Sequence, residues 1–190
     1  MQKDDTLSDF SALGLAPRIL ENLSGLGLTT PTPIQTEAIP AAMAGRDVLG
    51  LAQTGTGKTA AFGLPMLTRL LAVGRRPDAG TCRALILAPT RELATQITEN
   101  LQGFAAGTPV RVFRVVGGAS INAQAERLAR GVDVLVATPG RLLDLLERKA
   151  VSLGRVEFLV LDEADQMLDL GFIHALRRIA RLGPAERQTL

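Results

Sequence analysis

The sequence has few of the side chains that build stacking surfaces, disulfides or metal sites. Its 190 residues include no Trp, no Tyr and six Phe, which argues against nucleic-acid recognition by a broad aromatic platform. A single cysteine, Cys82, excludes an internal disulfide framework. Together with the lone histidine, His174, it leaves too few ligands for a structural zinc site. We expect Cys82 to be inert and His174 to be a surface or packing residue of a helix.

The chain also lacks a large excess of charge and a long apolar run. Lys and Arg number 21 against 19 Asp and Glu, and the net charge of +2 provides no broad basic field for nucleic acid. No apolar run approaches the roughly 18 residues that a membrane-spanning helix needs. Residues 1–5 are not followed by the apolar segment of a signal peptide. We therefore expect no membrane partner and a cytoplasmic location.

The remaining sequence alternates between apolar stretches and helical patterns. Several apolar stretches are continuous, which is typical of strands buried on both faces of a parallel sheet. The stretches of strand length are 47–51, 83–88, 110–116, 132–137 and 156–161. The helical patterns between them are 58–73, 90–105, 120–130 and 139–149. This alternation predicts an α/β domain with a mostly parallel central sheet and helices on both faces.

The first 45 residues differ from the rest. Pro17 is placed where a helix begins and Gly27 where it ends. Residues 29–33 form a rigid extended stretch, because the residue before a proline is biased away from helix. A second helix is expected over 34–44, interrupted near Pro40. We interpret residues 1–45 as a cap of the same domain whose main body is 46–190.

A phosphate-binding loop is the strongest single signal. The segment 52–59 reads Ala-Gln-Thr-Gly-Thr-Gly-Lys-Thr and lies between an apolar strand pattern and a helix pattern. Gly55 and Gly57 allow the backbone to adopt positive φ and bring N–H groups to phosphate oxygens. The start of the following helix also favours anions. Lys58 can reach the β- and γ-phosphates, and the hydroxyl of Thr59 can bind Mg²⁺.

Two acids follow the last apolar stretch. Asp162 and Glu163 come directly after Phe-Leu-Val-Leu, where the end of a buried strand would place them beside the phosphate loop. Asp162 is predicted to hold Mg²⁺, and Glu163 is predicted to orient and polarise the attacking water. Alternatively, the two acids mark a strand end and cap the next helix.

The segment 162–165 spells Asp-Glu-Ala-Asp, and with the other short motifs it resembles the DEAD-box RNA helicases. The Pro-Thr-Pro-Ile-Gln of 31–35 resembles the Q motif of this family, and 52–59 resembles its motif I, including the first alanine. Three further segments resemble motif Ia, the GG motif and motif Ib: 89–93, 117–118 and 138–141. The resemblance extends from about Phe10 to the last residue and implies a RecA-like P-loop fold.

The resemblance implies an ATP-dependent helicase with Mg²⁺ as its metal. Gln35 would read adenine with its amide, and Phe10 would pack near the base. The residues expected to bind nucleotide are Phe10, Gln35, Thr54, Gly55, Thr56, Gly57, Lys58 and Thr59. Those with catalytic roles would be Lys58, Asp162 and Glu163, with Thr59 and Asp162 on the metal. Asp165 would couple this domain to a second RecA-like domain.

The same resemblance implies a site for single-stranded or duplex RNA. Thr90 and Thr138 each open a helix pattern at a strand end, where free N–H groups face anions. Arg91 and Arg141 are the plausible charged contacts, although either could instead pair with internal acids. The residues expected at this site are Thr90, Arg91, Gly117, Gly118, Thr138, Pro139, Gly140 and Arg141. Backbone and arginine contacts read phosphate and sugar rather than base.

The sequence contains no Ser-Ala-Thr motif and no second RecA-like domain with its arginine finger. We therefore expect an N-terminal, ATP-binding half of a helicase that is nearly inactive alone. Two other functions stay open. One is a DNA translocase of the same superfamily, which nucleic-acid competition would distinguish. The other is a non-catalytic RNA-binding module, which nucleotide titration would distinguish.

Overall fold

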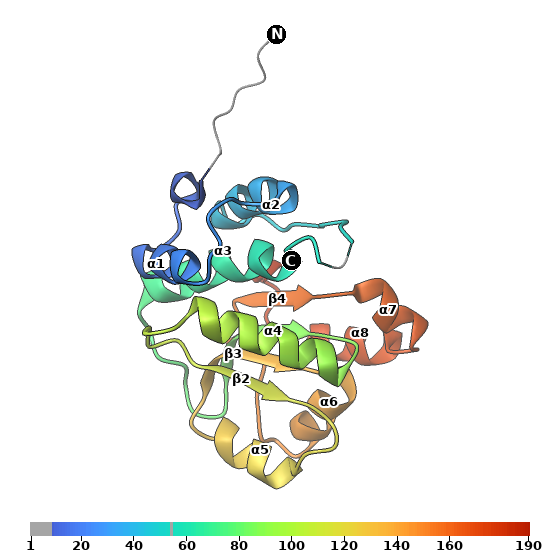
Figure 1. The fold of residues 1–190 in the computed structure, drawn as a ribbon. Helices are drawn as coiled ribbons and strands as arrows, with labels where there is room; N and C mark the ends of the chain where they lie inside the picture. The colour runs from blue at the N-terminus through green and yellow to red at the C-terminus, as the bar shows by residue number, and fades with distance from the viewer. Residues whose placement is uncertain (1–8, 54) are drawn as a thin grey trace.

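The structure is a computed structural model that describes residues 9–53 and 55–190. Its centre is a sheet of five strands, all parallel, in the order β2-β3-β1-β4-β5 (Figure 1). The strands are β1 Cys82–Leu87, β2 Val112–Val115, β3 Val132–Ala137, β4 Phe158–Leu161 and β5 Gln188–Thr189. The predicted α/β class with a parallel sheet is confirmed, and the architecture is that of a RecA-like domain.

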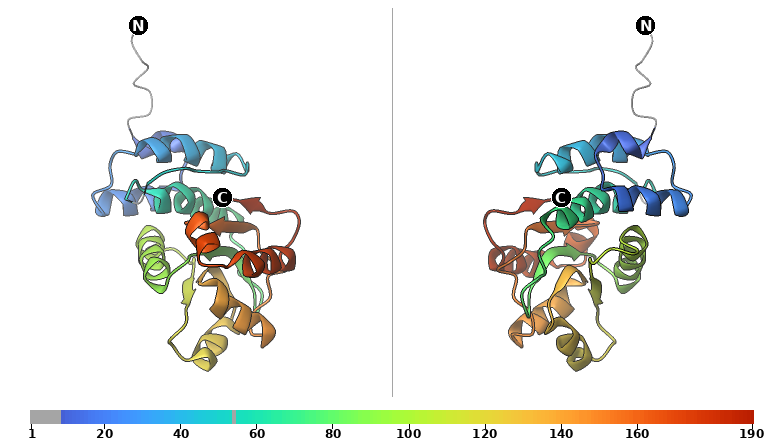
Figure 2. Two further views of the ribbon diagram at one scale, coloured as in Figure 1. Left: turned by 90° about the vertical axis from the view of Figure 1, so that its right-hand side faces the viewer. Right: turned by 90° about the vertical axis from the view of Figure 1, so that its left-hand side faces the viewer.

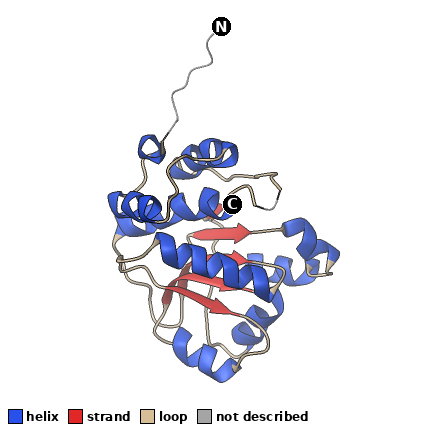
Figure 3. Cartoon of the chain, in the orientation of Figure 1, coloured by secondary structure: helices blue, strands red, loops and turns tan. Residues whose placement is uncertain are grey.

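Helices cover both faces of this sheet (Figures 2 and 3). One face packs against α3 (Lys58–Val73) and α4 (Arg91–Phe104), with the 3-10 helix η1 (Phe10–Leu13), α1 (Pro17–Gly25) and α2 (Pro33–Met43) in the same core. The other face packs against α5 (Ile121–Leu128), α6 (Pro139–Glu147), α7 (Ala164–Asp169) and α8 (Ile173–Leu182). No helix of the described residues is long and apolar enough to cross a membrane.

Strand β1 shows why its sequence is apolar throughout. Ala84 and Ile86 enter the core on one side, and Leu85 and Leu87 enter the core on the other. All six residues of β1 are buried. A strand in the middle of a three-layer domain has no solvent face, so the alternation of a half-exposed strand is absent.

Helices α3, α4, α5 and α6 lie where the four patterns predict, and α3 coincides with the prediction of 58–73. Two predictions are wrong. The helix at 34–44 is not interrupted, since α2 passes Pro40 without a break. The segment 47–51 is not a strand. Its neighbour β5 has only two residues, and a single backbone bond from Val48 N–H to Thr189 C=O (3.1 Å) joins the two segments.

The helices before residue 45 share their core with the sheet domain. Ile19 and Leu23 of α1 and Ile39 of α2 are buried in the cluster that contains the inner residues of α3 and α4. The side chain of Asn22 donates to the carbonyl oxygens of Phe104 (2.7 Å) and Ala106 (2.9 Å) at the end of α4. This shared packing supports our proposal that the first 45 residues cap the same domain.

The parallel strands place their carboxyl ends at one edge of the sheet. There β1 leads to Thr90, β2 leads to Gly117, β3 leads to Thr138 and β4 leads to Asp162. Ligands of open α/β sheets bind outside this edge. The topology therefore gathers at one edge the motifs that are separated in the sequence.

Candidate functional site

The loop before α3 has the backbone geometry of a phosphate-binding turn. Gly55 has a φ of +83° and Gly57 has a φ of +90°. Residues with a Cβ rarely adopt such values. Gly57 is the N-cap of α3, so Lys58 and Thr59 lie in the first turn, where backbone N–H groups have no partner within the helix. Thr54, also predicted to bind nucleotide, lies outside the described residues.

The predicted Q motif is bonded to this loop. The hydroxyl of Thr32 donates to the Thr56 carbonyl oxygen at 2.8 Å. Nε2 of Gln35 donates to the Gly57 carbonyl oxygen at 3.1 Å, while its Oε1 accepts the Thr32 N–H at 2.9 Å. A Cβ on Gly57 would collide with the amide of Gln35. Gln35 is buried and keeps one donor hydrogen and one lone pair for a further partner.

The two predicted acids differ in their surroundings. Asp162 is buried at the end of β4. Burial raises the pKa of the Asp162 carboxyl above its ordinary value of 3.8, and the charge of Lys58 partly offsets this effect. Oε1 of Glu163 lies 3.3 Å from Nζ of Lys58, and the two side chains are 22% and 23% exposed. The structure thus brings together the three residues predicted to be catalytic.

A cavity of about 690 Å³ extends from these residues between α2, α3 and the ends of β4 and β5. Lys58, Asp162, Glu163 and Asp165 line it. Thr59 is half-buried on the first turn of α3 and is not a lining residue. Phe10 is 3% exposed within the hydrophobic core and does not line the cavity either.

This arrangement fits Mg²⁺ with a nucleotide better than a metal held by protein alone. The described residues contain no group of three His, Cys, Asp or Glu side chains that could hold a metal ion. Mg²⁺ in phosphate sites usually takes one or two protein oxygens and receives the remainder from phosphates and water. The buried carboxylate of Asp162 and the hydroxyl of Thr59 suit such a partial ligand set.

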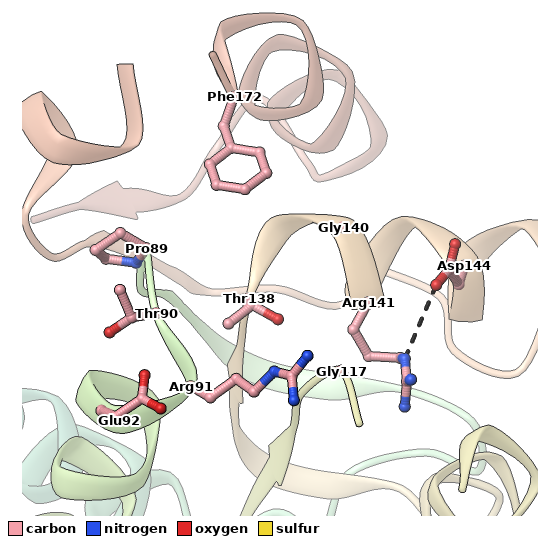
Figure 4. Close-up of a pocket in the computed structure, with 10 residues that line it drawn as sticks. All are labelled: Pro89, Thr90, Arg91, Glu92, Gly117, Thr138, Gly140, Arg141, Asp144 and Phe172. Carbon is pink, nitrogen blue, oxygen red and sulfur yellow. Dashed lines mark ion pairs between the residues drawn. The ribbon is translucent and has the colours of Figure 1, made fainter. Parts of the chain in front are cut away.

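A second cavity of about 550 Å³ lies at the same edge of the sheet (Figure 4). It collects three separate motifs whose segments follow β1, β2 and β3. The residues of the predicted RNA site that line it are Thr90, Arg91, Gly117, Thr138, Gly140 and Arg141. Pro139 is buried at the first position of α6, and Gly118 lies against the guanidinium of Arg91. Neither Pro139 nor Gly118 lines the cavity.

The predicted RNA site did not include four of the lining residues, which are Pro89, Glu92, Asp144 and Phe172. Phe172 is the N-cap of α8, and its ring points into the cavity opposite Thr138 (Figure 4). In the sequence Phe172 begins an amphipathic helical pattern, which by itself gives no sign of a binding role. Its place beside the Asp-Glu-Ala-Asp helix was the available signal, since α7 ends at Asp169, only three residues earlier.

The family model of the DEAD/DEAH box helicases matches residues 32–190. The chain belongs to the DEAD/DEAH box helicase family. The match includes the lining residues of both cavities and all the motifs except Pro31 of the Q motif, so the recognition made from the short motifs is confirmed.

Relatives of this helicase domain have been named in bacteria and plants. It is 46% identical over 182 residues to the RNA helicase CrhR of Synechocystis sp.. The aligned region covers 96% of this chain and 36% of that protein. It is 47% identical over 181 residues to the DEAD-box ATP-dependent RNA helicase CshA of Streptococcus pneumoniae, covering 95% and 34%. DEAD-box ATP-dependent RNA helicase 52A of Oryza sativa is 48% identical over 181 residues, covering 90% and 30%. The chain therefore spans about a third of the length of these relatives.

Proposed function

We propose that this domain binds ATP with Mg²⁺ and supplies half of the RNA-binding surface of an ATP-dependent RNA helicase. The observation that carries the proposal is the meeting of Lys58, Asp162 and Glu163 beside the glycine turn, at the edge that also holds the second cavity. In the full enzyme, ATP binding and hydrolysis would be coupled to local opening of RNA duplexes.

Lys58 and Glu163 explain how the site would respond to phosphate. The ammonium of Lys58 is paired with the Glu163 carboxylate at 3.3 Å. The β- and γ-phosphates of ATP would compete for Lys58, because they carry more negative charge than one carboxylate. Glu163 would then lose its partner and become free to accept a proton from the attacking water.

Asp162 and Thr59 would hold the metal, which when bound neutralises charge on the phosphate oxygens. The raised pKa of Asp162 has burial as its first cause. A cation near the carboxylate would offset the cost of burying that charge. Lys58 supplies part of the positive charge that stabilises the Asp162 carboxylate. A bound Mg²⁺ would supply the remainder.

We assign the recognition of the adenine base to the side-chain amide of Gln35. Its two inner bonds, to Thr32 N–H and the Gly57 carbonyl oxygen, hold the amide against the phosphate loop. The remaining donor and acceptor complement the N7 and N6 amine of adenine and mismatch guanine. Base recognition and loop geometry therefore depend on the same side chain.

The second cavity would bind single-stranded RNA, or one strand of a duplex, through phosphate and sugar. The starts of α4 and α6 present N–H groups, and Arg91 is exposed beside them. Phe172 offers an apolar face for a ribose or base. Asp165 lines the nucleotide cavity in the first turn of α7, where a second RecA-like domain could read nucleotide state.

Calorimetric titration of the chain with ADP and GDP in the presence of Mg²⁺ tests this proposal. ADP should bind more tightly, and Gln35→Ala should remove the preference, since a lost polar contact costs about 1–3 kcal/mol. Lys58→Ala should weaken the binding of both ADP and GDP. Gln96→Ala, on the exposed side of α4, is the matched control. Equal affinity for ADP and GDP in the parent chain would contradict the adenine assignment.

A further inference from the structure

Helix α2 forms one wall of the cavity to which we assign nucleotide, and it packs along α3 (Figure 1). Ile34, Ala38 and Ala42 line the cavity, and their spacing places them on one face of the helix. Gln35 lies in the first turn, and Ala42 lies about 10 Å further along the axis at about 1.5 Å per residue. The direction of this wall therefore depends on what holds each end of α2.

The first end of α2 is held by the phosphate loop. The hydroxyl of Thr32 donates to the carbonyl oxygen of Thr56, and the amide of Gln35 donates to the carbonyl oxygen of Gly57. Both bonds lie where the helix begins. They fix the position of the first turn, but a helix that is held at one end can still change its tilt.

The other end of α2 is held by Gln188 of β5. Its Nε2 donates to the carbonyl oxygens of Ala42 at 3.0 Å and of Arg46 at 2.5 Å. Its Oε1 accepts a hydrogen bond from Nη1 of Arg69 on α3, and the guanidinium of Arg69 lies 4.9 Å from the ring centre of Phe158 on β4. The buried amide of Gln188 thus connects α2, α3 and the sheet, with both donor hydrogens in use.

The segment after α2 has two further bonds to β5. The N–H of Thr189 donates to Oδ1 of Asp47 at 2.8 Å, and the N–H of Val48 donates to the carbonyl oxygen of Thr189 at 3.1 Å. Asp47 is exposed and Val48 is half-buried, whereas Gln188 is only 6% exposed. A lost bond to a buried group costs more than one beside water. Gln188 is therefore the main attachment of this end of the wall.

We propose that Gln188 is a positioning residue that fixes the tilt of α2 and, through it, the direction in which the Gln35 amide faces the base. The proposal rests on the proposed nucleotide-binding function, and Gln188 itself does not line the cavity. Without Gln188, α2 would rotate about its first turn. The phosphate loop would keep its bonds to Thr32 and Gln35, so phosphate binding would persist while base recognition is weakened.

A comparison of ADP with inorganic pyrophosphate tests this separation in the 190-residue chain. Gln188→Met keeps the length of the side chain and removes its three bonds. Calorimetric titration with Mg²⁺ should show an ADP affinity about tenfold lower, the factor expected for one well-oriented polar contact. Competition of pyrophosphate against ADP should give an affinity within about twofold of the parent.

The matched control is Gln102→Met. Gln102 also donates to a backbone carbonyl oxygen, that of Val112 at 3.3 Å, but it is exposed on α4. Its loss should change neither affinity. Equal weakening of ADP and pyrophosphate in Gln188→Met would show a general loosening of the site and overturn the proposal. An ADP affinity equal to that of the parent would overturn it as well.

Gln188→Glu is a milder variant. It keeps the size of the side chain and an acceptor for Arg69, whose charge balances the new carboxylate. It replaces the donor nitrogen by an oxygen that faces the carbonyl oxygens of Ala42 and Arg46. The same selective loss of ADP affinity is expected. If Gln188→Glu binds ADP as the parent does, the two donated bonds do not position α2.

Hydrogen exchange tests the attachment without a ligand. The N–H groups of Gly45, Arg46 and Val48 are bonded to the carbonyl oxygens of Ala42, Ala41 and Thr189. In Gln188→Met these three amides should exchange about tenfold faster, while those of α4 keep the parent rates. Unchanged exchange at the three amides, or equally faster exchange throughout the chain, would contradict the positioning role. If the parent does not bind ADP, the nucleotide function fails, and exchange still decides whether Gln188 holds α2.

Discussion

Glu163 adopts a backbone conformation that few residues other than glycine adopt. Its φ is +54°, in the left-handed region, at the N-cap of α7. Such a conformation costs about 1–3 kcal/mol and persists where surrounding structure requires it. Here it is coupled to the 3.3 Å contact between Glu163 and Lys58. The strain therefore accompanies the side chain to which we assign proton transfer.

Glu163→Gln should separate nucleotide binding from hydrolysis. The amide keeps the shape of the side chain but cannot accept a proton at neutral pH, so ATP affinity should stay within about threefold of the parent while hydrolysis falls by about 10²–10⁴. The measurement is ATP binding and RNA-saturated turnover in a protein that carries both domains of the proposed enzyme, with Glu186→Gln, an exposed glutamate, as control. Turnover at the parent rate would show that Glu163 is not the base.

The raised pKa of Asp162 predicts that the stability of the folded protein depends on pH. Because its folded-state pKa is raised above 3.8, the folded protein keeps this proton to higher pH than the unfolded chain. The free energy of unfolding should therefore fall as pH rises from 3.8 through the raised value. Asp162→Asn should remove that slope and stabilise the protein at pH 7 by about 0.5–2 kcal/mol.

Urea denaturation at several pH values measures both effects. Asp169→Asn, at the exposed end of α7, changes the same charge without the burial and should leave the slope unchanged. A lower stability of Asp162→Asn at neutral pH would mean that its attraction to Lys58 outweighs the cost of burial.

The starts of α4 and α6 differ, although their sequences suggest the same capping role for Thr90 and Thr138. The hydroxyl of Thr90 accepts the N–H of Leu93 at 3.2 Å. Thr138 makes no side-chain cap bond, and Pro139 begins α6 instead. The hydroxyl of Thr138 faces the cavity with its bonding capacity unused by the helix (Figure 4).

Thr90→Ala should therefore lower the free energy of unfolding by about 1 kcal/mol, the usual value of a lost cap. Thr138→Ala should change it by less than about 0.5 kcal/mol. If both residues contact RNA, both variants should weaken oligouridine binding. Thr138→Ala should then weaken binding without a comparable loss of stability, whereas Thr90→Ala should lower both. Thermal melts and anisotropy titrations check this. Equal destabilisation by the two variants would contradict the assignment of the cap.

At the scale of the whole molecule, the cavity to which we assign nucleotide contains little positive charge. Among its lining residues in the described part of the chain, Lys58 is the only cation. An arginine finger is worth roughly 10³–10⁵ in the rate of phosphoryl transfer. Arg91 and Arg141 line the second cavity instead. We therefore assign the finger to a second RecA-like domain of the proposed enzyme.

This 190-residue chain should accordingly bind adenine nucleotide, show almost no RNA-stimulated ATPase and unwind no duplex. Covalent addition of the proposed second RecA-like domain should restore ATPase and unwinding, because linkage raises the effective concentration of the two domains to about the millimolar range. Steady-state ATPase with saturating single-stranded RNA is the measurement. Turnover on the order of 1 s⁻¹ by the chain alone would show that its catalytic site is complete.

The local patterns of the sequence carry most of the fold. The helix at 58–73 and the buried strands could be predicted because apolar runs and helical periodicity are local properties. The phosphate loop and Asp162–Glu163 were found in the same way, since their chemistry depends on consecutive residues. The strand expected at 47–51 did not form, because a strand needs a partner of matching length and β5 offers two residues.

Long-range contacts belong to the tertiary structure. Arg83 looks like an ordinary strand residue, yet it is buried and bonded to Glu157 (2.9 Å) and to the Leu70 carbonyl oxygen (3.1 Å). Arg91 and Arg141 both lie in the first turn of a helix that follows a strand, and only the fold leaves Arg91 exposed and bonds Arg141 to Gln124. The reason is physical: a motif specifies its own backbone turn, whereas the partner of a side chain depends on which strands are neighbours.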